Sequence, residues 1–398
     1  MAKIMVVNCG SSSLKFQLFE MDTEDVITSG IVERIGYEDA IFTIKYNGQK
    51  ETKTLSVPTH NEAVKLLLDN LLEKHIVASL DEIKGIGHRV VQGGSYFDSS
   101  VRIDDDVKAK IEELIPLAPL HNQAHLIGIN ACMKAMPNAG ETATFDTAFH
   151  QTMPAKNYIY PIPYEYYTDH KIRKYGAHGT SHYYVSQRTL DYLGRPEHSN
   201  IIVCHLGAGA SLCAVKDGQS YNTSMGLTPL AGVMMSTRCG DIDASVIDYL
   251  DENLHMSIKD ITNMLNKKSG LLGVSGVSGD MRDVKAAADE GNERAKLAID
   301  IFIRRVADYL GKYYVQLGKV DAISFTAGIG ENAPWVRKLI LEAVGEALGI
   351  VIDDDANENG EGERLISAPE SKVKVYVIPT NEELVIARDA KKILNLIG

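Results

Sequence analysis

Two turns of small residues in this chain have the composition of loops that hold phosphate groups. The first lies in Val-Val-Asn-Cys-Gly-Ser-Ser-Ser-Leu-Lys-Phe at residues 6–16, and the second in Val-Cys-His-Leu-Gly-Ala-Gly-Ala-Ser-Leu-Cys at residues 203–213. Glycine and serine let the backbone approach an oxyanion closely and direct several N–H groups at it. One such turn alone is usually a structural hairpin. Its repetition in the second half of the chain favours two similar halves that hold a polyphosphate between them.

Two further glycine-rich segments, at residues 276–280 and 327–332, extend this pattern. We expect all four segments to follow apolar strands, because ligands of open α/β sheets bind beyond the carboxyl ends of strands. None of the four matches G-x-G-x-x-G or G-x-x-x-x-G-K-[ST], so the sequence has neither the dinucleotide fingerprint nor a P-loop. Taken together, four such turns favour nucleotide binding over four unrelated tight connections.

Two arginines lie among glycines and apolar residues, in a context that favours a cleft. Arg89 lies near the end of an expected strand, shortly before Gly93-Gly94, and Arg238 lies in Ser-Thr-Arg-Cys-Gly-Asp at residues 236–241. A guanidinium presents a rigid fork to a phosphate or a carboxylate. For these two residues we favour anion binding over a surface ion pair, whereas Lys15 fits a solvated strand position equally well.

Carboxylate and amide side chains near strand and helix ends are candidate cation ligands. Asp146 closes an expected strand, and Glu382 opens the last expected helix, where the helix dipole also favours an acidic residue. Asn8 offers an amide oxygen, a ligand that suits a hard cation such as Mg²⁺. The sequence therefore allows a Mg²⁺ site at Asn8 and Glu382, with a capping role for Glu382 as the alternative.

His178 and His182 stand four residues apart in Ala-His-Gly-Thr-Ser-His. This spacing suits zinc only on a continuous helix. We expect Ser181 to be the N-cap, which places His178 before the helix, and the glutamate of H-E-x-x-H is missing. A metal pair is therefore not expected, and His178 is left with two roles, a structural one or donation to a phosphoryl oxygen.

The hydrophobic pattern predicts the elements that position these residues. Strands mixed with helices in two similar halves predict an α/β fold of two lobes. The Tyr- and Pro-rich segment 151–170 is the best candidate boundary, and the last helix is a candidate to return to the first lobe. Strands are expected at residues 4–7, 14–19, 40–46, 85–91, 141–145, 201–205, 211–215, 322–326 and 373–378, and helices at 61–74, 104–115, 123–136, 181–193, 293–317, from 334 onward and at 382–396.

Length, charge and cysteine content limit the functions open to the protein. Its 398 residues suffice for two or three domains, and its net charge of −12 argues against nucleic-acid and anionic-membrane partners. Five cysteines without C-x-x-C spacing favour reduced thiols rather than a zinc site or disulfides. The apolar run at residues 4–7 is too short for a signal peptide, and no stretch approaches a membrane span. We therefore expect a cytoplasmic protein.

Ordered motifs along essentially the whole chain resemble those of the acetate kinases, a family within the acetate and sugar kinase/Hsc70/actin superfamily. The resemblance implies two lobes, each with a duplicated actin-like or ribonuclease H-like βββαβαβα core. It implies an N-terminal lobe of residues 1–149 with 383–398, a nucleotide-binding and dimerisation lobe of residues 150–382, and a cytosolic homodimer. The motifs are NCGSSSLK at residues 8–15, GHRVV at 87–91, PLAPLHN at 116–122, FDTAFH at 145–150, HGTSH at 178–182, TRCGD at 237–241, GIGEN at 328–332 and PTNEEL at 379–384.

The same resemblance implies reversible phosphoryl transfer from ATP to acetate, which gives acetyl phosphate and ADP with Mg²⁺, or alternatively Mn²⁺, as the metal. It implies that Asp146 is the catalytic acid, that His178 and Arg238 stabilise the transition state, and that Asn8 and Glu382 hold the metal. The implied substrate positions are Arg89, Val91, Leu120 and Pro229. The implied ATP positions are Ser11, Ser13, Lys15, His205, Leu206, Gly207, Ala208, Gly209, Asp280, Met281, Arg282, Gly328, Ile329, Gly330, Glu331 and Asn332.

Five positions depart from the family pattern. Ala177 stands where the family usually has Phe beside the acyl group, and Ala208 stands where Asn usually completes the phosphate turn. Ala231, Ser236 and Ala244 replace the usual Glu, Gly and Pro around Arg238. A missing aromatic side chain leaves volume unfilled, so we expect a looser acyl pocket.

Acetate is already ionised at neutral pH, so the nucleophile needs no base. We expect direct in-line transfer, in which Mg²⁺ and Lys15 hold the ATP phosphates while the two arginines and His178 surround the moving phosphoryl group. In this mechanism Asp146 orients a cation rather than moving a proton. Phosphorylation of Glu382 is the alternative pathway, and a kinase for propionate or butyrate and a non-catalytic actin- or Hsp70-like nucleotide switch are the alternative functions.

Overall fold

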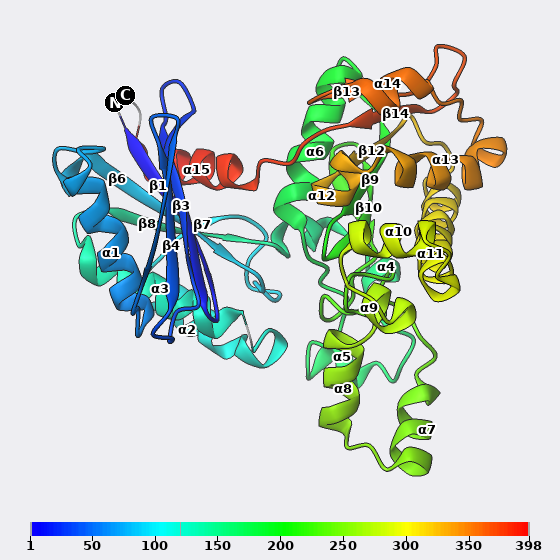
Figure 1. The fold of residues 1–398 in the computed structure, drawn as a ribbon, viewed down its shortest axis with the longest axis horizontal. Coiled ribbons are helices and arrows are strands. Elements are labelled where there is room, and N and C mark those ends of the chain that lie inside the picture. Colours follow the sequence, from blue (N-terminus) through cyan, green and yellow to red (C-terminus); the bar gives the residue numbers. More distant parts are fainter. Residues whose placement is uncertain (1, 120, 397–398) are drawn as a thin grey trace. The chain divides into compact units, whose positions relative to one another are not determined.

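The computed structural model describes residues 2–119 and 121–396, which fall into two compact units. Unit 1 consists of Met1–Phe149 and Asn381–Gly398, and unit 2 consists of His150–Thr380. The chain therefore builds most of unit 1, then all of unit 2, and returns to unit 1 with its last helix (Figure 1). No helix among the described residues is long and apolar enough to cross a membrane.

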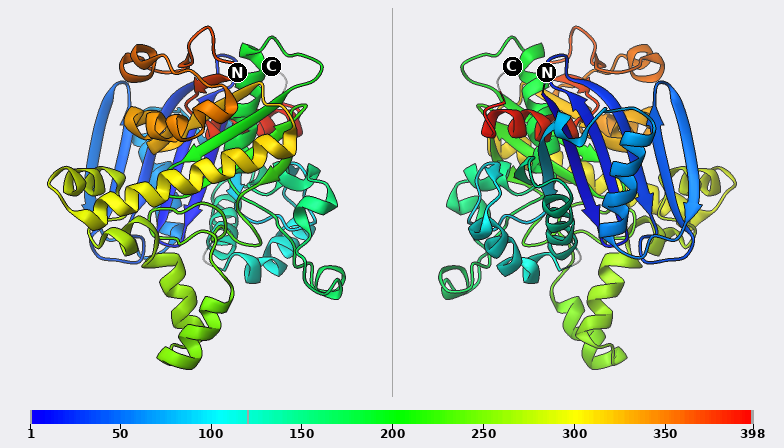
Figure 2. Two further views of the ribbon diagram at one scale, coloured as in Figure 1. Left: turned by 90° about the vertical axis from the view of Figure 1, so that its right-hand side faces the viewer. Right: turned by 90° about the vertical axis from the view of Figure 1, so that its left-hand side faces the viewer.

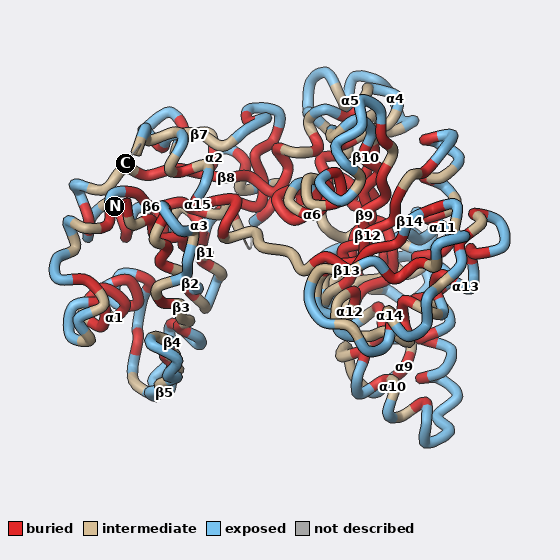
Figure 3. The backbone as a smooth tube through the Cα atoms, turned by 90° about the horizontal axis from the view of Figure 1, so that it is seen from above, coloured by how far each residue is buried: buried red, intermediate tan, exposed pale blue. Residues whose placement is uncertain are grey.

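Unit 1 is built on an eight-stranded sheet. Its strands are β1 (Lys3–Gly10), β2 (Ser13–Glu20), β3 (Asp25–Glu33), β4 (Ala40–Tyr46), β5 (Gln49–Leu55), β6 (Ile83–Val90), β7 (Val101–Arg102) and β8 (Gly140–Phe145). Their order in the sheet is β5-β4-β3-β2-β1-β6-β8-β7. β1 pairs antiparallel with β2 and parallel with β6, which in turn pairs parallel with β8. β1 and β8 are mostly buried, whereas the edge strand β5 is largely exposed (Figure 3).

Helices complete the core of unit 1. Those of at least nine residues are α1 (His60–Glu73), α2 (Asp105–Glu113), α3 (Asn122–Ala135) and α15 (Glu382–Ile393). α1 and α3 pack together and share an apolar core with residues of β1 such as Met5 and Val7. α15 packs against β1, β6 and β8, and glycines make its close approach possible. A Cβ at Gly87 would lie 2.5 Å from Cγ2 of Ile386, and one at Gly140 would lie 2.6 Å from Leu394.

Unit 2 repeats the central topology of unit 1. Its strands are β9 (Asn200–Leu206), β10 (Ala210–Lys216), β11 (Gln219–Thr223), β12 (Ala322–Thr326), β13 (Arg364–Leu365) and β14 (Lys374–Val377). They form one sheet in the order β11-β10-β9-β12-β14-β13. β9 pairs antiparallel with β10 and parallel with β12, and β12 pairs parallel with β14. Because β1, β2, β6 and β8 pair in the same way, the predicted duplication is confirmed.

The longest helix of unit 2 is α11 (Glu293–Leu317), whose limits agree with the predicted ones. It runs across the sheet of unit 2 and contacts β9 and β10 (Figure 2). Its apolar face is buried, with Ala298, Phe302 and Val306 fully enclosed. The other helices are α4 (Ala155–Tyr158), α5 (Glu165–Thr168), α6 (Gly179–Tyr192), α7 (Ser245–Leu254), α8 (Ile258–Lys267), α9 (Gly270–Ser275), α10 (Met281–Asp289), α12 (Ala327–Asn332), α13 (Pro334–Leu348) and α14 (Asp354–Asn359).

Three local predictions were wrong. Segment 276–280 follows the helix α9 rather than a strand, and Gly276 ends that helix in the left-handed conformation with φ 71°. Segment 327–332 forms the short helix α12 rather than an open turn. Helix α6 begins at Gly179, before the expected cap Ser181, so that His178 itself is the N-cap residue.

Candidate active site

Arg89 and Asp146 form a two-point ion pair within unit 1. β6 and β8 lie side by side, so Asp146, which directly follows β8, comes next to the end of β6. Arg89 Nε donates to Oδ1 of Asp146 at 3.0 Å, and Nη2 donates to Oδ2 at 2.6 Å. The Asp146 side chain is 1% exposed, whereas that of Arg89 remains 24% exposed. Burial opposes the charge of Arg89, but the carboxylates of Asp146, Glu382 and Glu383 outweigh it and raise the pKa of Arg89.

The predicted cation ligands of unit 1 lie at the end of β1 and the start of α15. Asn8 is the register partner of Lys15, and both line a pocket of about 230 Å³ together with Glu383. Glu382 is the first residue of α15, directly after its N-cap Asn381. Mg²⁺ usually keeps several waters and takes only one or two carboxylates, so this small set of oxygen donors fits it. The described residues hold no group of three or more His, Cys, Asp or Glu side chains that would enclose a metal.

The remaining predicted residues of unit 1 differ in exposure. Val91 directly follows β6 and is buried. Ser11 lies in the two-residue turn between β1 and β2 and is exposed, and Ser13 opens β2. Leu120 lies outside the described residues.

In unit 2, His178 and Arg238 converge on the backbone of Gly209 in the turn between β9 and β10. A Cβ at Gly209 would lie 3.3 Å from both Cε1 and Nε2 of His178, and 3.5 Å from Nη1 of Arg238. Any residue larger than glycine would therefore fill the space that the imidazole, the guanidinium and the turn enclose. His178 has φ 56°, a left-handed conformation that the surrounding structure must maintain in a residue other than glycine.

The guanidinium of Arg238 is held by a backbone carbonyl rather than by a carboxylate. Its Nη1 donates to the carbonyl oxygen of Pro229 at 3.2 Å. Burial lowers the pKa of Arg238, and no acidic group among the described residues offsets this effect. Arg238 therefore contrasts with Arg89, whose charge is matched by Asp146. A half-buried cation without a counter-charge provides an attractive site for an anion.

Four histidines and the serines that hydrogen-bond to them form a cluster that includes His178, the ring beside Gly209. The rings of His178 and His205 stack with their centroids 4.1 Å apart. Nδ1 of His178 and Nε2 of His182 both lie within hydrogen-bond distance of the Ser211 hydroxyl, at 2.9 Å and 2.7 Å. The other pairs in the cluster are His205 with Ser181 and His150 with Ser220, each at 2.8 Å.

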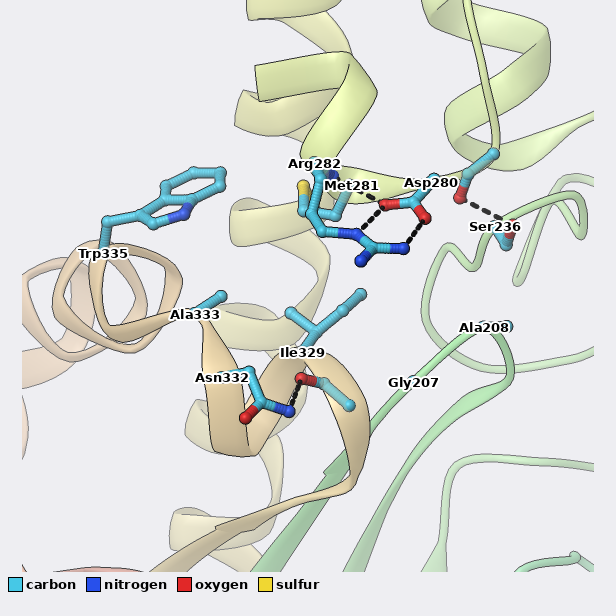
Figure 4. A pocket seen from close by; sticks show the side chains of 12 residues that line it. Gly207, Ala208, Ser236, Asp280, Met281, Arg282, Ile329, Asn332, Ala333 and Trp335 are labelled. Carbon is cyan, nitrogen blue, oxygen red and sulfur yellow. Dashed lines mark hydrogen bonds and ion pairs between the residues drawn. The ribbon is translucent and has the colours of Figure 1, made fainter. Parts of the chain in front are cut away.

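A pocket of about 520 Å³ opens beside the turn between β9 and β10 (Figure 4). Arg282 folds back on Asp280, the N-cap residue of α10, and this contact lowers the pKa of Asp280 to about 2. Trp335 and Ile329 contribute apolar surface. The pocket is lined by Gly207, Ala208, Ser236, Gly279, Asp280, Met281, Arg282, Gly328, Ile329, Asn332, Ala333 and Trp335.

Ser236 connects three of the segments around this pocket. Its backbone N–H donates to the carbonyl oxygen of Ala208 at 3.1 Å, and its hydroxyl donates to the carbonyl oxygen of Gly279 at 2.6 Å. A glycine at this position, as in the family pattern, could make only the first of these bonds. The departure at Ser236 therefore adds a link between the Arg238 loop and the segment that leads into α10.

Some predicted nucleotide positions support the pocket from outside it. His205, Leu206, Gly209, Gly330 and Glu331 do not line it. The Glu331 carboxylate instead accepts hydrogen bonds from the backbone N–H of Ala327 at 2.8 Å and of Thr380 at 3.3 Å. Sequence analysis missed Trp335 and Ala333, which line the pocket, and Ser211, because β10 is buried on both faces and its sequence shows no alternation that would single out Ser211.

Comparison with known proteins places the chain in a family. The model of the Acetokinase family matches residues 3–388. The acetate kinase of Geobacillus kaustophilus is 55% identical over 397 residues, which cover 100% of both chains. The crystal structure of Porphyromonas gingivalis acetate kinase superposes with a TM-score of 0.94 at 44% identity, covering 99% of this chain and 100% of that one. A propionate kinase from Francisella tularensis gives a TM-score of 0.93 at 46% identity, with coverages of 98% and 100%.

Proposed function

This chain belongs to the Acetokinase family, and on that premise we propose that it transfers the γ-phosphoryl group of ATP to acetate, giving acetyl phosphate and ADP in a reversible reaction. The observation that carries the proposal is the convergence of His178 and Arg238 on Gly209 beside the pocket of about 520 Å³. Enzymes transfer phosphoryl groups chiefly by positioning them and by neutralising their charge. A donor ring and an uncompensated guanidinium at a glycine turn are suited to both tasks.

Unit 2 provides the nucleotide site in this proposal. The pocket volume lies within the range of small-molecule sites, roughly 300–1,000 Å³. The glycines at 207 and 209 allow close approach of phosphates, while Ile329 and the Arg282 stem offer surface to a base. Lys15 remains a proposed contact of the ATP phosphates from unit 1.

Arg89 provides the carboxylate site. Asp146 fixes both the position and the plane of its guanidinium, and the part of Arg89 that stays exposed is available to a second carboxylate. Because acetate is ionised at neutral pH, the reaction needs no proton removed from it. We therefore assign Asp146 the role of orienting Arg89, and we assign Val91, which directly follows β6, to the contact with the methyl group.

We propose Mg²⁺ as the metal, held through Asn8 and Glu382. When bound, it would neutralise charge on the ATP phosphates. In-line transfer between ATP and acetate needs no covalent intermediate, whereas phosphorylation of Glu382 would divide the reaction into two displacements. The configuration at a chiral γ-phosphorus distinguishes these pathways, since one displacement inverts it and two retain it.

A kinase that prefers propionate is the second candidate function. The propionate kinase among the similar structures and the alanine at position 177 both favour it. Ala177 is 3% exposed and lies within the apolar core of unit 2, so its small side chain is enclosed rather than open to solvent. The ratio of kcat/KM for acetate and propionate decides between the two, and a ratio below one would favour propionate.

We also propose a cytoplasmic homodimer. Apolar side chains are exposed on and around α7 and α8, including Val246, Tyr249, Leu254 and Ile258, of which Tyr249 is 62% exposed. An exposed apolar patch of this kind favours a protein partner, and a second copy of the chain is the partner that the family resemblance implies. Light scattering during size-exclusion chromatography tests this, and a mass of 43.6 kDa would indicate a monomer instead.

The function itself is tested by acetate-dependent release of ADP from MgATP, coupled to detection of acetyl phosphate as its hydroxamate. We expect activity in the wild type and a loss of at least about 100-fold in kcat for Arg238→Ala. Arg238→Lys is the matched variant, because it keeps the charge and loses the fork. ADP release that does not depend on acetate would favour the nucleotide switch.

A further inference from the structure

The hydroxyl of Ser211 is shared by two histidines. Its distances are 2.9 Å to Nδ1 of His178 and 2.7 Å to Nε2 of His182, and all three side chains lie within unit 2. A hydroxyl has one proton and can donate only once, although it can accept twice. The direction of the bonds around Ser211 therefore determines which ring nitrogen of His178 carries hydrogen.

The environment of His182 limits its protonation. This residue is fully buried, and burial together with the nearby His150 and His205 lowers its pKa well below the ordinary value. His182 is therefore neutral near pH 7 and has a single N–H group. Its Nδ1 is buried and has no hydrogen-bond partner among the described residues. Buried N–H groups without an acceptor are rarer in proteins than acceptors without a donor, so the hydrogen of His182 belongs on Nε2.

The remaining bonds follow from this assignment. Nε2–H of His182 donates to Ser211 Oγ, which has no third partner among the described residues. The Ser211 proton must then go to Nδ1 of His178. If His178 also donated from Nδ1, the buried hydroxyl proton of Ser211 would be left without an acceptor, which is unfavourable.

We propose that Ser211 and His182 are positioning residues that hold His178 in the tautomer with hydrogen on Nε2. This inference rests on the proposed function of His178 as a donor to the transferred phosphoryl group. Nε2 is the edge of the ring that faces Gly209, where Nη1 of Arg238 also lies. We call the hydrogen-bonded series His182–Ser211–His178 the relay. It directs an N–H, rather than a bare lone pair, at the place where negative charge must be stabilised.

The test uses Ser211→Ala, with Ser220→Ala as the matched control. Ser220 is also buried and its hydroxyl lies within hydrogen-bond distance of a histidine, His150, whereas among the described residues it forms no hydrogen bond with His178. We expect kcat to fall about 10- to 100-fold in Ser211→Ala, with KM for ATP and acetate within about twofold of the wild type. Ser220→Ala should retain wild-type kcat.

Nitrogen NMR of ring-labelled histidine, assigned with a His178→Asn variant, reports the tautomer directly. In the wild type Nδ1 of His178 should be unprotonated, and in Ser211→Ala both tautomers should appear. A wild-type spectrum with hydrogen on Nδ1, or a Ser211→Ala protein with wild-type kcat, would overturn the relay.

If Ser211→Ala fails to fold, His182→Gln and His182→Leu replace it, since the glutamine amide can donate to Ser211 as Nε2 does. Glutamine should then retain kcat and leucine should lose it, and equal activities would contradict the proposal.

The relay and the proposed function can fail separately. A wild type that is inactive with acetate but shows His178 protonated on Nε2 would remove the function and keep the relay. If the wild type is active and Ser211→Ala changes neither the spectrum nor kcat, the proposed function stands and the relay is removed.

Discussion

Arg337 is completely buried, and its Nη1 donates to the carbonyl oxygen of Gly330 at 2.9 Å. The same guanidinium also binds the carbonyl oxygen of Glu331 at 2.9 Å and both the side chain and the backbone of Asn357. Burial lowers the pKa of Arg337 to about 10, so it remains charged at neutral pH. One side chain thus connects α12, which contributes to the nucleotide pocket, with α13 and α14.

We expect Arg337→Met to weaken this connection. Three backbone carbonyls would lose their donor, which should lower the free energy of unfolding by about 2–5 kcal/mol and raise KM for ATP. Denaturant unfolding and steady-state kinetics measure the two effects. Arg195→Met is the control, because Arg195 is exposed and pairs only with surface groups. Equal stabilities of the two variants would show that the buried guanidinium does not support α12.

Gly209→Ala should reduce kcat without unfolding the protein. The added Cβ would lie 3.3 Å from the His178 ring, closer than ordinary contact, and would displace the imidazole or the Arg238 guanidinium. We expect a fall in kcat of about 100-fold, similar to the loss of an oxyanion donor. Gly311→Ala in α11 is the control, since a Cβ there meets no atom within 4 Å and should add about 0.5–1 kcal/mol of stability. Wild-type kcat in Gly209→Ala would contradict this account of the site.

Trp335 gives a direct measure of nucleotide binding. It is the single tryptophan of the chain, and it lines the pocket assigned to ATP. Titration with ATP in the absence of acetate should change the emission of this residue and saturate at one nucleotide per chain, whereas acetate alone should leave it unchanged. A flat emission curve under conditions where ATP is consumed would place the nucleotide elsewhere.

Asp146→Asn should lower kcat/KM for acetate and leave its pH dependence unchanged. The amide can accept from Arg89 through only one atom, and its NH₂ group would oppose the second N–H of the guanidinium. We expect kcat/KM for acetate to fall about 10- to 100-fold, while KM for ATP stays unchanged. If Asp146 moved a proton during catalysis, one limb of the pH–rate profile would instead disappear in the variant.

Acid should destabilise unit 1 through His125. Burial, followed by the charge of Arg89, lowers the pKa of His125 to about 3 from its ordinary value near 6.5. Below pH 6.5 the unfolded chain binds a proton that the folded chain excludes, so this contribution to stability is complete above pH 6.5 and declines as the pH falls toward 3. His125→Leu should therefore lose less stability than the wild type between pH 6.5 and 4.5 in urea unfolding. If the free energy of unfolding fell equally with pH in the two proteins, His125 would not be the source of the acid sensitivity.

The elements that could be predicted from the sequence are those with strong local signals. α11 was predicted to the residue because its apolar positions repeat over seven turns between the N-cap Asn292 and Gly318. β5 was missed because it is a largely exposed edge strand of mixed charged residues and carries no apolar alternation. The helix α9 was missed because its six residues include two glycines, and its formation depends on packing against α11 rather than on propensity.

The site could be predicted as a set of residues but not as an arrangement. Motifs identified His178, Arg238 and Gly209 individually, and the structure brings them together because β9, β10 and α6 pack within one unit. Composition could not reveal that Arg89 is matched by a carboxylate while Arg238 is not. That difference arises from strand pairing between β6 and β8, which is a property of the fold.

The return of α15 to unit 1 has a consequence for synthesis on the ribosome. The glycine-lined surface of β6 and β8 is made early, but the helix that covers it consists of residues 382–393. All residues of unit 2 are translated before that helix, so unit 2 can fold while unit 1 still exposes apolar surface. We expect nascent chains that stop short of residue 382 to depend on chaperones through their first unit rather than their second.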